Sequence, residues 1–163
     1  MVARKEILEF HTECMFQKHM TAVLNIEKES FEHFWVERDF VRFLRKRDCL
    51  GRVVMIGDMV VGYVIYKLGR RKLHLLNFVV TSAYRRKGIG TQTIDALLEE
   101  NFSSDKHVMV TVNVRSSNLD GQLFFKAIGF KAINVLRGFY KNEDAYRFFY
   151  CRDSFAYVES VGL

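Results

Sequence analysis

The order of the expected elements along the chain predicts an α+β fold, a mixed α/β sandwich with one central sheet and helices on both faces. Three observations carry this prediction. Apolar residues in the first third recur at helical spacing, and the stretch that follows reads as antiparallel strands joined by short turns. The second half then alternates strand, helix, strand, helix, strand and strand.

Two helices are expected in the first third, each from apolar residues three or four positions apart. An aromatic-rich connector, Ser30–Trp35, joins them, and we expect its Phe34 and Trp35 mainly to cover the core and secondarily to wall a binding site. The first helix is marked by Phe16, Met20, Val23 and Leu24, and the second by Val36, Phe40, Phe43 and Leu44.

The strands begin after the second helix. Arg52–Ile56 and Val60–Leu68 flank Gly57-Asp58-Met59, which has the composition of a hairpin turn. Leu73–Val80 is almost wholly apolar after His74, as in a strand buried on both faces. The remaining elements are a helix with Ile94, Leu97 and Leu98 on one face, strand His107–Val114, helix Leu119–Ile128, and strands Ala132–Leu136 and Ala145–Arg152.

The composition predicts a single folded domain over residues 1–163. Hydrophobic residues make up 49% and charged residues 27%, and no Pro, repeat or low-complexity tract marks a linker. No apolar run approaches the roughly 20 residues that cross a bilayer, and Met1–Glu6 does not read as the start of a signal peptide. Cys14, Cys49 and Cys151 lack metal-type spacing, so we expect incidental thiols, no metal and a cytoplasmic location.

The net charge of +6 favours anionic partners, but it does not choose among nucleic acid, an acidic protein surface and a phosphorylated cofactor. The basic residues gather in three clusters. The first ends an expected helix and the second caps an expected hairpin, so both are expected to be solvated, and no nucleic-acid motif accompanies them. The third lies in a glycine-rich turn. The clusters are Arg42/Arg45/Lys46/Arg47, Arg70/Arg71/Lys72 and Arg85/Arg86/Lys87.

The most informative segment is Val80–Thr91, which leads from a buried strand into an amphipathic helix. A glycine-rich turn at a helix start aims free backbone N–H groups at one point, where the helix dipole adds positive charge. Gly88 and Gly90 are able to adopt positive φ and let a phosphate approach the main chain. The third basic cluster supplies formal charge for a pyrophosphate. A basic turn with glycines for tightness alone is the other interpretation.

Two motifs together carry a resemblance to a known family. Arg85-x-x-Gly88-x-Gly90 resembles the acetyl-CoA pyrophosphate loop of the GNAT acetyltransferases. Asn118, followed by Phe125-Lys126-Ala127-Ile128-Gly129-Phe130, resembles the family's second motif, an Asn followed on the next helix by Tyr-x-x-x-Gly-Phe. The resemblance implies the GNAT fold, a mostly antiparallel twisted sheet splayed at the cofactor strand, with acetyl-CoA as cosubstrate and no metal.

Shorter matches resemble the protein N-terminal acetyltransferases, including the ribosomal-protein alanine type. They are Ile26-Glu27 with Phe34-Trp35, the strand end Asn113–Asn118, and Phe139-Tyr140 with Glu143-Asp144-Ala145-Tyr146.

The resemblance also implies which residues hold acetyl-CoA. Main-chain groups of Phe78, Val79 and Val80 would pair with the pantetheine arm, and one N–H would polarise the thioester carbonyl as a preorganised donor. Asn118 would hydrogen-bond the pantetheine region, and Phe125 belongs to the same set. The pyrophosphate would lie in the turn formed by Arg85, Arg86, Lys87, Gly88, Ile89, Gly90 and Thr91.

The chain departs from the family at two catalytic positions. Asn113 stands where the alanine acetyltransferases carry a Glu, and Phe125 where they carry the Tyr that protonates the departing thiolate. An α-amino group of pKa about 8 is roughly a tenth neutral at pH 7, whereas a lysine is neutral only to about 0.04%. Lacking a base therefore costs about 1.4 kcal/mol for the first acceptor and roughly 4 for the second. The departures favour an α-amine acceptor, or a base supplied by another residue.

Three residues are the candidates for that chemistry. His74 begins the cofactor strand, where some family members place a Tyr that helps to hold a catalytic water, and a neutral imidazole accepts a proton near pH 7. Glu27, with Glu29, offers a carboxylate, although solvated helix-end glutamates are the expected state. Tyr140 lines the acceptor groove or donates a proton, with strand-edge packing as the other interpretation.

Four functions remain open, of which a nucleic-acid-binding module ranks last, because it is favoured by charge alone and lacks any recognised motif. The first is an N-acetyltransferase of a protein or peptide N-terminus, acting by direct attack in a ternary complex. The second is an acetyltransferase of a small amine or an internal lysine, and the third is a catalytically degenerate GNAT fold that binds acetyl-CoA as a regulator. The chain is expected to act as a monomer or homodimer, with no membrane and no specific nucleic acid among its partners.

Overall fold

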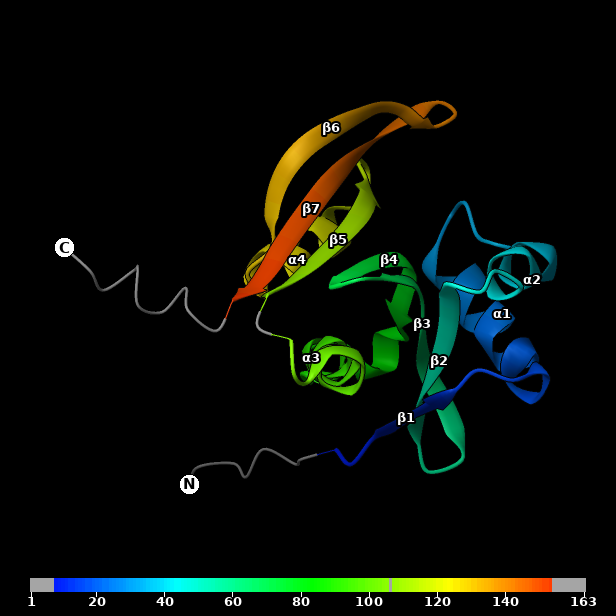
Figure 1. The fold of residues 1–163 in the computed structure, drawn as a ribbon. Coiled ribbons are helices and arrows are strands. Elements are labelled where there is room, and N and C mark those ends of the chain that lie inside the picture. Colours follow the sequence, from blue (N-terminus) through cyan, green and yellow to red (C-terminus); the bar gives the residue numbers. More distant parts are fainter. Residues whose placement is uncertain (1–7, 106, 154–163) are drawn as a thin grey trace, which may run out of the picture. The chain divides into compact units, whose positions relative to one another are not determined.

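A computed structural model describes residues 8–105 and 107–153 of the chain. They form a seven-stranded mixed sheet in the order β1-β2-β3-β4-β5-β7-β6 with four α-helices, so the predicted α+β class is confirmed (Figure 1). The strands are β1 His11–Cys14, β2 Cys49–Ile56, β3 Met59–Gly69, β4 Lys72–Val80, β5 His107–Arg115, β6 Lys131–Tyr140 and β7 Glu143–Asp153. The helices are α1 Met20–Ser30, α2 Glu37–Leu44, α3 Ile89–Phe102 and α4 Leu119–Ala127, and Gln17–His19 and Ser82–Tyr84 are short 3-10 turns.

By their internal contacts the residues fall into two compact units, which are described separately below. The first unit comprises the residues up to Ile65 together with Asn77–Leu97, and the second comprises Tyr66–Leu76 together with the residues from Leu98 onward. The border therefore falls inside β3, β4 and α3. The prediction of a single domain stays a prediction.

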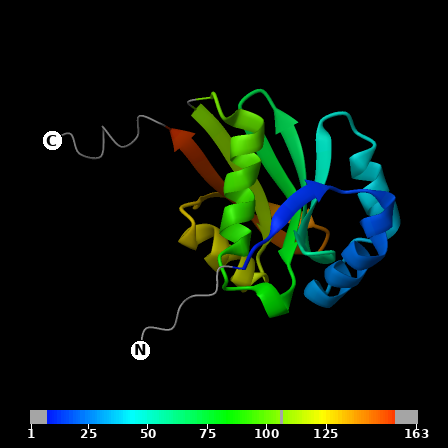
Figure 2. The same ribbon diagram turned by 90° about the horizontal axis from the view of Figure 1, so that it is seen from below.

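In the first unit, β2 and β3 separate α3 from α1 and α2, so helices lie on both faces of these strands (Figures 1 and 2). Val54, Val61, Val80 and Ile89 form a buried cluster that joins the strands to the beginning of α3. Gly62 allows β3 to approach the end of β4, because a Cβ there would lie 2.6 Å from the Val79 carbonyl oxygen. This close packing positions the strand end that leads into the glycine-rich turn.

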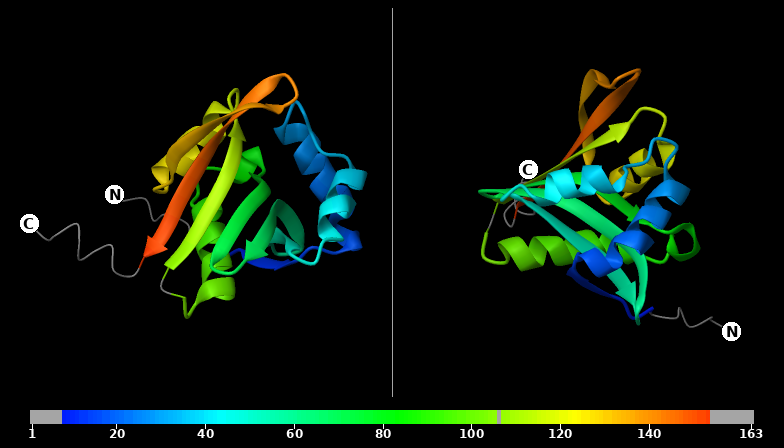
Figure 3. Two further views of the ribbon diagram at one scale, coloured as in Figure 1. Left: turned by 45° about the horizontal axis from the view of Figure 1, so that its top comes forward. Right: turned by 90° about the vertical axis from the view of Figure 1, so that its right-hand side faces the viewer.

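In the second unit, the beginning of β4 pairs in parallel with β5, and β5, β7 and β6 run side by side as antiparallel neighbours (Figure 3). Alternate residues of β5 face opposite sides, as the pleat requires. Val112 is paired with Phe148, and both are buried on the side of α4. The partly exposed Thr111, Asn113 and Arg115 therefore share the other face.

Several local expectations were wrong. Strand β1 was not expected, because four residues without apolar alternation carry little signal. Phe16 lies before α1 and is exposed rather than packed on its inner face. Val36 is the extended N-cap residue of α2, so its side chain is also exposed. Phe34 is 42% exposed and does not cover the core, whereas Trp35 packs on Phe40 and Phe43 as expected.

Strand β4 is less buried than its apolar run suggested. Leu73, Leu75, Val79 and Val80 are buried, but the residues from Leu76 to Phe78, like His74, are only partly so. One face of the strand therefore keeps access to solvent, which a strand covered on both faces would not have. Among the described residues, no helix combines the length and apolarity needed to cross a membrane.

Candidate active site

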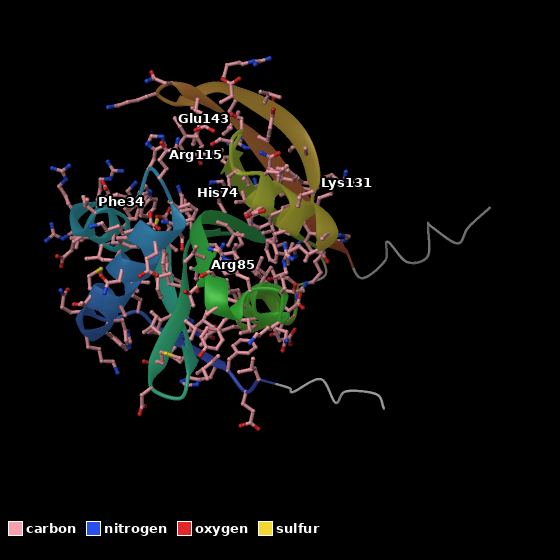
Figure 4. All side chains as sticks on the ribbon, turned by 180° about the vertical axis from the view of Figure 1, so that it is seen from behind. Phe34, His74, Arg85, Arg115, Lys131 and Glu143 are labelled. Atoms are coloured by element: carbon pink, nitrogen blue, oxygen red, sulfur yellow. The ribbon has the colours of Figure 1, made fainter. Side chains whose placement is uncertain are left out.

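The turn between β4 and α3 is held in shape by contacts within the first unit. The Thr81 N–H donates to the Val61 carbonyl at 2.8 Å, and the Arg85 side chain donates through Nε to the Val80 carbonyl at 2.7 Å. The Lys87 ammonium lies 5.4 Å from the centre of the Tyr84 ring. Arg85 thus closes the turn onto the strand that precedes it (Figure 4).

Two residues of the turn, separated by a single residue, have a left-handed backbone conformation. Arg86 has φ 59° and Gly88 has φ 80°, whereas Gly90 lies inside the first turn of α3. The positive φ expected of Gly90 is therefore wrong, and a non-glycine residue, Arg86, takes a left-handed conformation instead. The Gln92 N–H donates to the Gly88 carbonyl at 3.0 Å and so begins the helical hydrogen bonding. The N–H groups of Ile89, Gly90 and Thr91 precede that bond and point out of the helix start.

The end of β4, before the turn, offers a ligand its backbone groups rather than its side chains. Val79 and Val80 are buried, so their apolar groups belong to the core. Phe78 packs partly against the same buried cluster. Any ligand that uses these residues must therefore use their backbone groups, as the resemblance implies.

Glu27 has an environment opposite to the solvated one expected of it. Its side chain is 1% exposed near the end of α1. Oε1 accepts from the Trp35 N–H at 2.6 Å, and Oε2 accepts from the Tyr63 hydroxyl and from the Asn77 amide. Burial raises the pKa of the Glu27 carboxyl, while the three hydrogen bonds lower it. Glu29, by contrast, is exposed.

His74 lies on the polar face of the second unit. Its Nδ1 is 2.7 Å from the Thr111 hydroxyl, and β4 and β5 place the two residues side by side in register. A cavity of about 320 Å³ adjoins the ring and is also lined by Lys67 and Phe149. Burial, followed by the positive charges of Arg147 and Lys67, lowers the pKa of His74 below its ordinary value of 6.5. The ring is therefore neutral and able to accept a proton at pH 7.

Asn113 and Tyr140 lie further along the same face. The Asn113 Oδ1 accepts from the Arg147 Nε at 3.0 Å, and its carbonyl accepts from the Tyr140 hydroxyl at 3.1 Å. Burial raises the pKa of Tyr140. The Asn113 amide is thus held in one orientation. In this arrangement the Tyr140 hydroxyl donates its hydrogen bond to a backbone carbonyl.

A charged cluster closes the end of β5. The Arg115 guanidinium lies 3.9 Å from the centre of the Tyr140 ring and donates to the Glu143 carboxylate at 3.1 Å (Figure 4). The Ser117 N–H donates to the same carboxylate at 2.7 Å. Hydrogen bonds, above all those from Ser117, hold the pKa of Glu143 at about 2. This carboxylate is therefore ionised throughout the neutral range and fixes the turn that leads to Asn118.

Asn118 and Phe125 belong to α4 and its cap. The Asn118 Oδ1 accepts from the Gly121 N–H at 2.9 Å, so this side chain caps the helix. Phe125 is buried and packs edge-on against Phe124 and Phe130. A phenyl ring in that position supplies apolar packing and no proton.

The sequence reasoning did not single out four residues that complete these arrangements. They are Tyr63, Asn77, Thr111 and Arg147, which contact Glu27, His74 or Asn113. One signal was available, since polar residues alternate with valines from Thr111 to Arg115 and thereby share one face of a strand. The partners from distant strands had no such signal.

The comparisons with known proteins agree with the fold. The sequence model of the acetyltransferase (GNAT) family matches residues 20–130, so the chain belongs to this family. It is an N-acetyltransferase of the GNAT class, as the names of its relatives also indicate.

One relative in sequence and two solved structures illustrate the similarity. An N-alpha-acetyltransferase of Sulfurisphaera tokodaii is 32% identical over 124 residues, which cover 66% of this chain and 72% of that protein. The crystal structure of the ribosomal-protein-S18-alanine N-acetyltransferase from Escherichia coli has a TM-score of 0.76 at 19% identity, and covers 89% of this chain and 95% of that one. The crystal structure of Arabidopsis thaliana NAA60 in complex with acetyl-CoA has a TM-score of 0.73 at 15% identity, with 88% and 98% covered.

Proposed function

We propose that this chain transfers the acetyl group of acetyl-CoA to the α-amine of a protein or peptide N-terminus, by direct attack in a ternary complex. The observation that carries the proposal is the turn after β4, where the positive φ of Arg86 and Gly88 precedes the free N–H groups at the start of α3. The N-alpha-acetyltransferase name of the archaeal relative supports the α-amine.

The turn suits a pyrophosphate in shape as well as charge. Gly88 has no side chain, and a Cβ there would lie 3.2 Å from the Gln92 Nε2, while Arg86 and Lys87 are exposed beside it. Backbone groups of Phe78, Val79 and Val80 would hold the pantetheine arm and polarise the thioester carbonyl. Asn118 keeps its amide NH₂ for the same ligand, because helix capping uses only its oxygen.

In the proposed step the acceptor nitrogen attacks the thioester carbonyl carbon, a C–N bond forms, and the C–S bond breaks to release the CoA thiolate. His74 takes the amine proton, directly or through one water, since its lowered pKa keeps it neutral. The Tyr140 hydroxyl donates to the Asn113 carbonyl, and Tyr140 would donate a proton or line the acceptor groove. No carboxylate is needed, because about a tenth of an α-amine is already neutral at pH 7.

One observation favours a second function, an acetyl-CoA-binding regulator without turnover. Phe125 is buried and has no hydroxyl, and the Asn113 amide is held by Arg147. Neither Asn113 nor Phe125 takes or gives a proton, so the two positions that resemble catalytic positions of the family do not transfer protons in this chain.

Release of free CoA from acetyl-CoA, measured across peptide N-termini, polyamines and lysine peptides, tests the proposal. Peptide N-termini should be the best acceptors by kcat/KM. Tight acetyl-CoA binding without turnover on any acceptor would support the regulatory function instead.

The turn itself is tested by calorimetric titration with acetyl-CoA. Gly88→Glu should abolish binding, because a side chain and a negative charge would occupy the phosphate space at a φ of 80°. Arg45→Glu makes a larger change of charge beyond the end of α2 and should leave binding nearly unchanged. Equal losses in both variants would show that general charge, rather than the turn, holds the ligand.

A further inference from the structure

Three donors converge on one buried carboxylate in the first unit. From this geometry we infer that Glu27 is a positioning residue, which holds the connector Ser30–Trp35 in place so that Phe34 contacts the acceptor. The inference rests on the proposed acetyl transfer and adds to it the residues that set acceptor binding.

Glu27 contacts both ends of the connector, the first through its main chain and the second through its side chain. Its carbonyl oxygen accepts from the Phe31 N–H at 3.1 Å, and its carboxylate accepts from the Trp35 N–H at 2.6 Å. The chain between these two hydrogen bonds is irregular, with α1 ending at Ser30 and α2 beginning at Glu37. The Phe31 bond is the last backbone hydrogen bond of α1, so the bond from Trp35 is the one by which the Glu27 side chain fixes the far end of this irregular segment.

The same carboxylate connects this segment to the strands. Its Oε2 accepts from the Tyr63 hydroxyl in β3 and from the Asn77 Nδ2 in β4 at 3.1 Å. Asn77 immediately precedes Phe78, the first residue whose main chain is proposed to hold the pantetheine arm. Glu27 thus sets the position of the connector against the strand that carries the acetyl donor.

The connector turns its two aromatic rings in different directions. The Trp35 ring stacks on Phe43 with centroids 4.8 Å apart and meets Phe40 edge-on at 5.3 Å. The neighbouring Phe34 is 42% exposed (Figure 4). With Trp35 packed inward, Phe34 is left to offer an apolar surface to a ligand.

Glu27 does not serve as the base. Its side chain is 1% exposed, and each carboxylate oxygen already accepts a hydrogen bond from a neutral donor. A buried carboxylate with three neutral donors costs desolvation energy that a purely structural site would avoid with an apolar residue. The arrangement is explained if the connector must be held in one place.

The test is a kinetic double-mutant cycle with Glu27→Gln and Phe34→Ala. The glutamine keeps the length of the side chain and an oxygen for the Trp35 N–H, but turns an NH₂ toward the Asn77 amide. Each single variant should raise the acceptor KM about tenfold, as expected for loss of one buried hydrogen bond or one apolar contact. The kcat and the Kd for acetyl-CoA should change by less than about twofold. The double variant should be no worse than the poorer single one, because Glu27 acts through Phe34.

Glu37→Gln is the matched control, since it makes the same change on an exposed residue of α2, and its kinetics should equal those of the wild type. If Glu27→Gln fails to fold, Tyr63→Phe removes a single donor and should give a smaller rise in the same KM. A lowered melting temperature with an unchanged acceptor KM, or additive effects in the cycle, would overturn the inference. A wild-type protein without turnover on any acceptor would refute the proposed function, and the positioning role with it.

Discussion

At the scale of single residues, His74 shows how neighbouring residues change the pKa of a side chain. Desolvation disfavours its protonated form, and Arg147 and Lys67 act in the same direction. These neighbours and burial place the pKa of His74 below its ordinary value of 6.5. The Thr111 hydroxyl at 2.7 Å orients the ring.

The pH dependence of kcat/KM tests this assignment. The ascending limb due to His74 should lie below pH 6.5, and Arg147→Met should move it upward, because one of the charges that lower the pKa is removed. His74→Gln should abolish the limb and reduce turnover by about 10²-fold, with acetyl-CoA affinity intact. Robust turnover that is indifferent to His74→Gln would exclude the ring as the base.

Glu143 gives a second prediction at this scale. Its pKa in the folded chain is about 2, below that of the unfolded chain, so its contribution to stability is present above the unfolded value and is lost as the pH falls toward 2. Glu143→Gln should therefore lower the melting temperature at pH 7, and added salt should reduce the difference because the group is screened by solvent. The difference from the wild type should shrink steadily between pH 5 and pH 3. A difference that is constant over this range would mean that the charge of Glu143 does not matter.

At the scale of elements, the end of β4 and the start of α3 form one arrangement. The strand ends where Thr81 bonds to β3, the turn closes through Arg85, and the helix begins at Ile89 with its first N–H groups directed outward. Strand β3 packs closely enough to support this end only because residue 62 is a glycine.

Gly62→Ala tests that support. The new Cβ would lie 2.6 Å from the Val79 carbonyl oxygen, so the end of β4 must shift. We expect a loss of about 1–3 kcal/mol of stability, as for other overpacked sites, together with weaker acetyl-CoA binding by calorimetry. Gly69→Ala is the control, because a Cβ there would lie 3.6 Å from the Lys72 Cβ, an ordinary contact distance. Identical behaviour of the two variants would contradict a role for the close approach.

At the scale of the whole molecule, the two compact units share three elements. The chain passes from one unit to the other within β3, within β4 and within α3. Neither unit is a continuous segment, so neither has a complete set of strands that could be cut out of the sequence. One cooperative domain, which the composition predicts, stays a prediction.

Scanning calorimetry tests that prediction. The chain should unfold in one transition, with equal calorimetric and van't Hoff enthalpies. Acetyl-CoA at about 100 times its Kd should stabilise the folded chain by about 2.7 kcal/mol and move the transition as a whole. Two resolved transitions, of which acetyl-CoA moves only one, would show that the units are independent.

The sequence by itself determined the order of the elements after β1, the α+β class and the glycine-rich turn, because these depend on periodicity and on residues that are neighbours in the chain. It could not determine which acidic and polar residues are sequestered. Glu27 lies on the same helical face as Met20 and Val23, and the exposed Glu29 does not. The sequence could not, however, show the donors from Trp35, Tyr63 and Asn77 that satisfy the buried carboxylate. Asn113 and His74 likewise depend on Arg147, which reaches them from another strand. Such environments arise from contacts between distant segments, so the tertiary structure alone decided them.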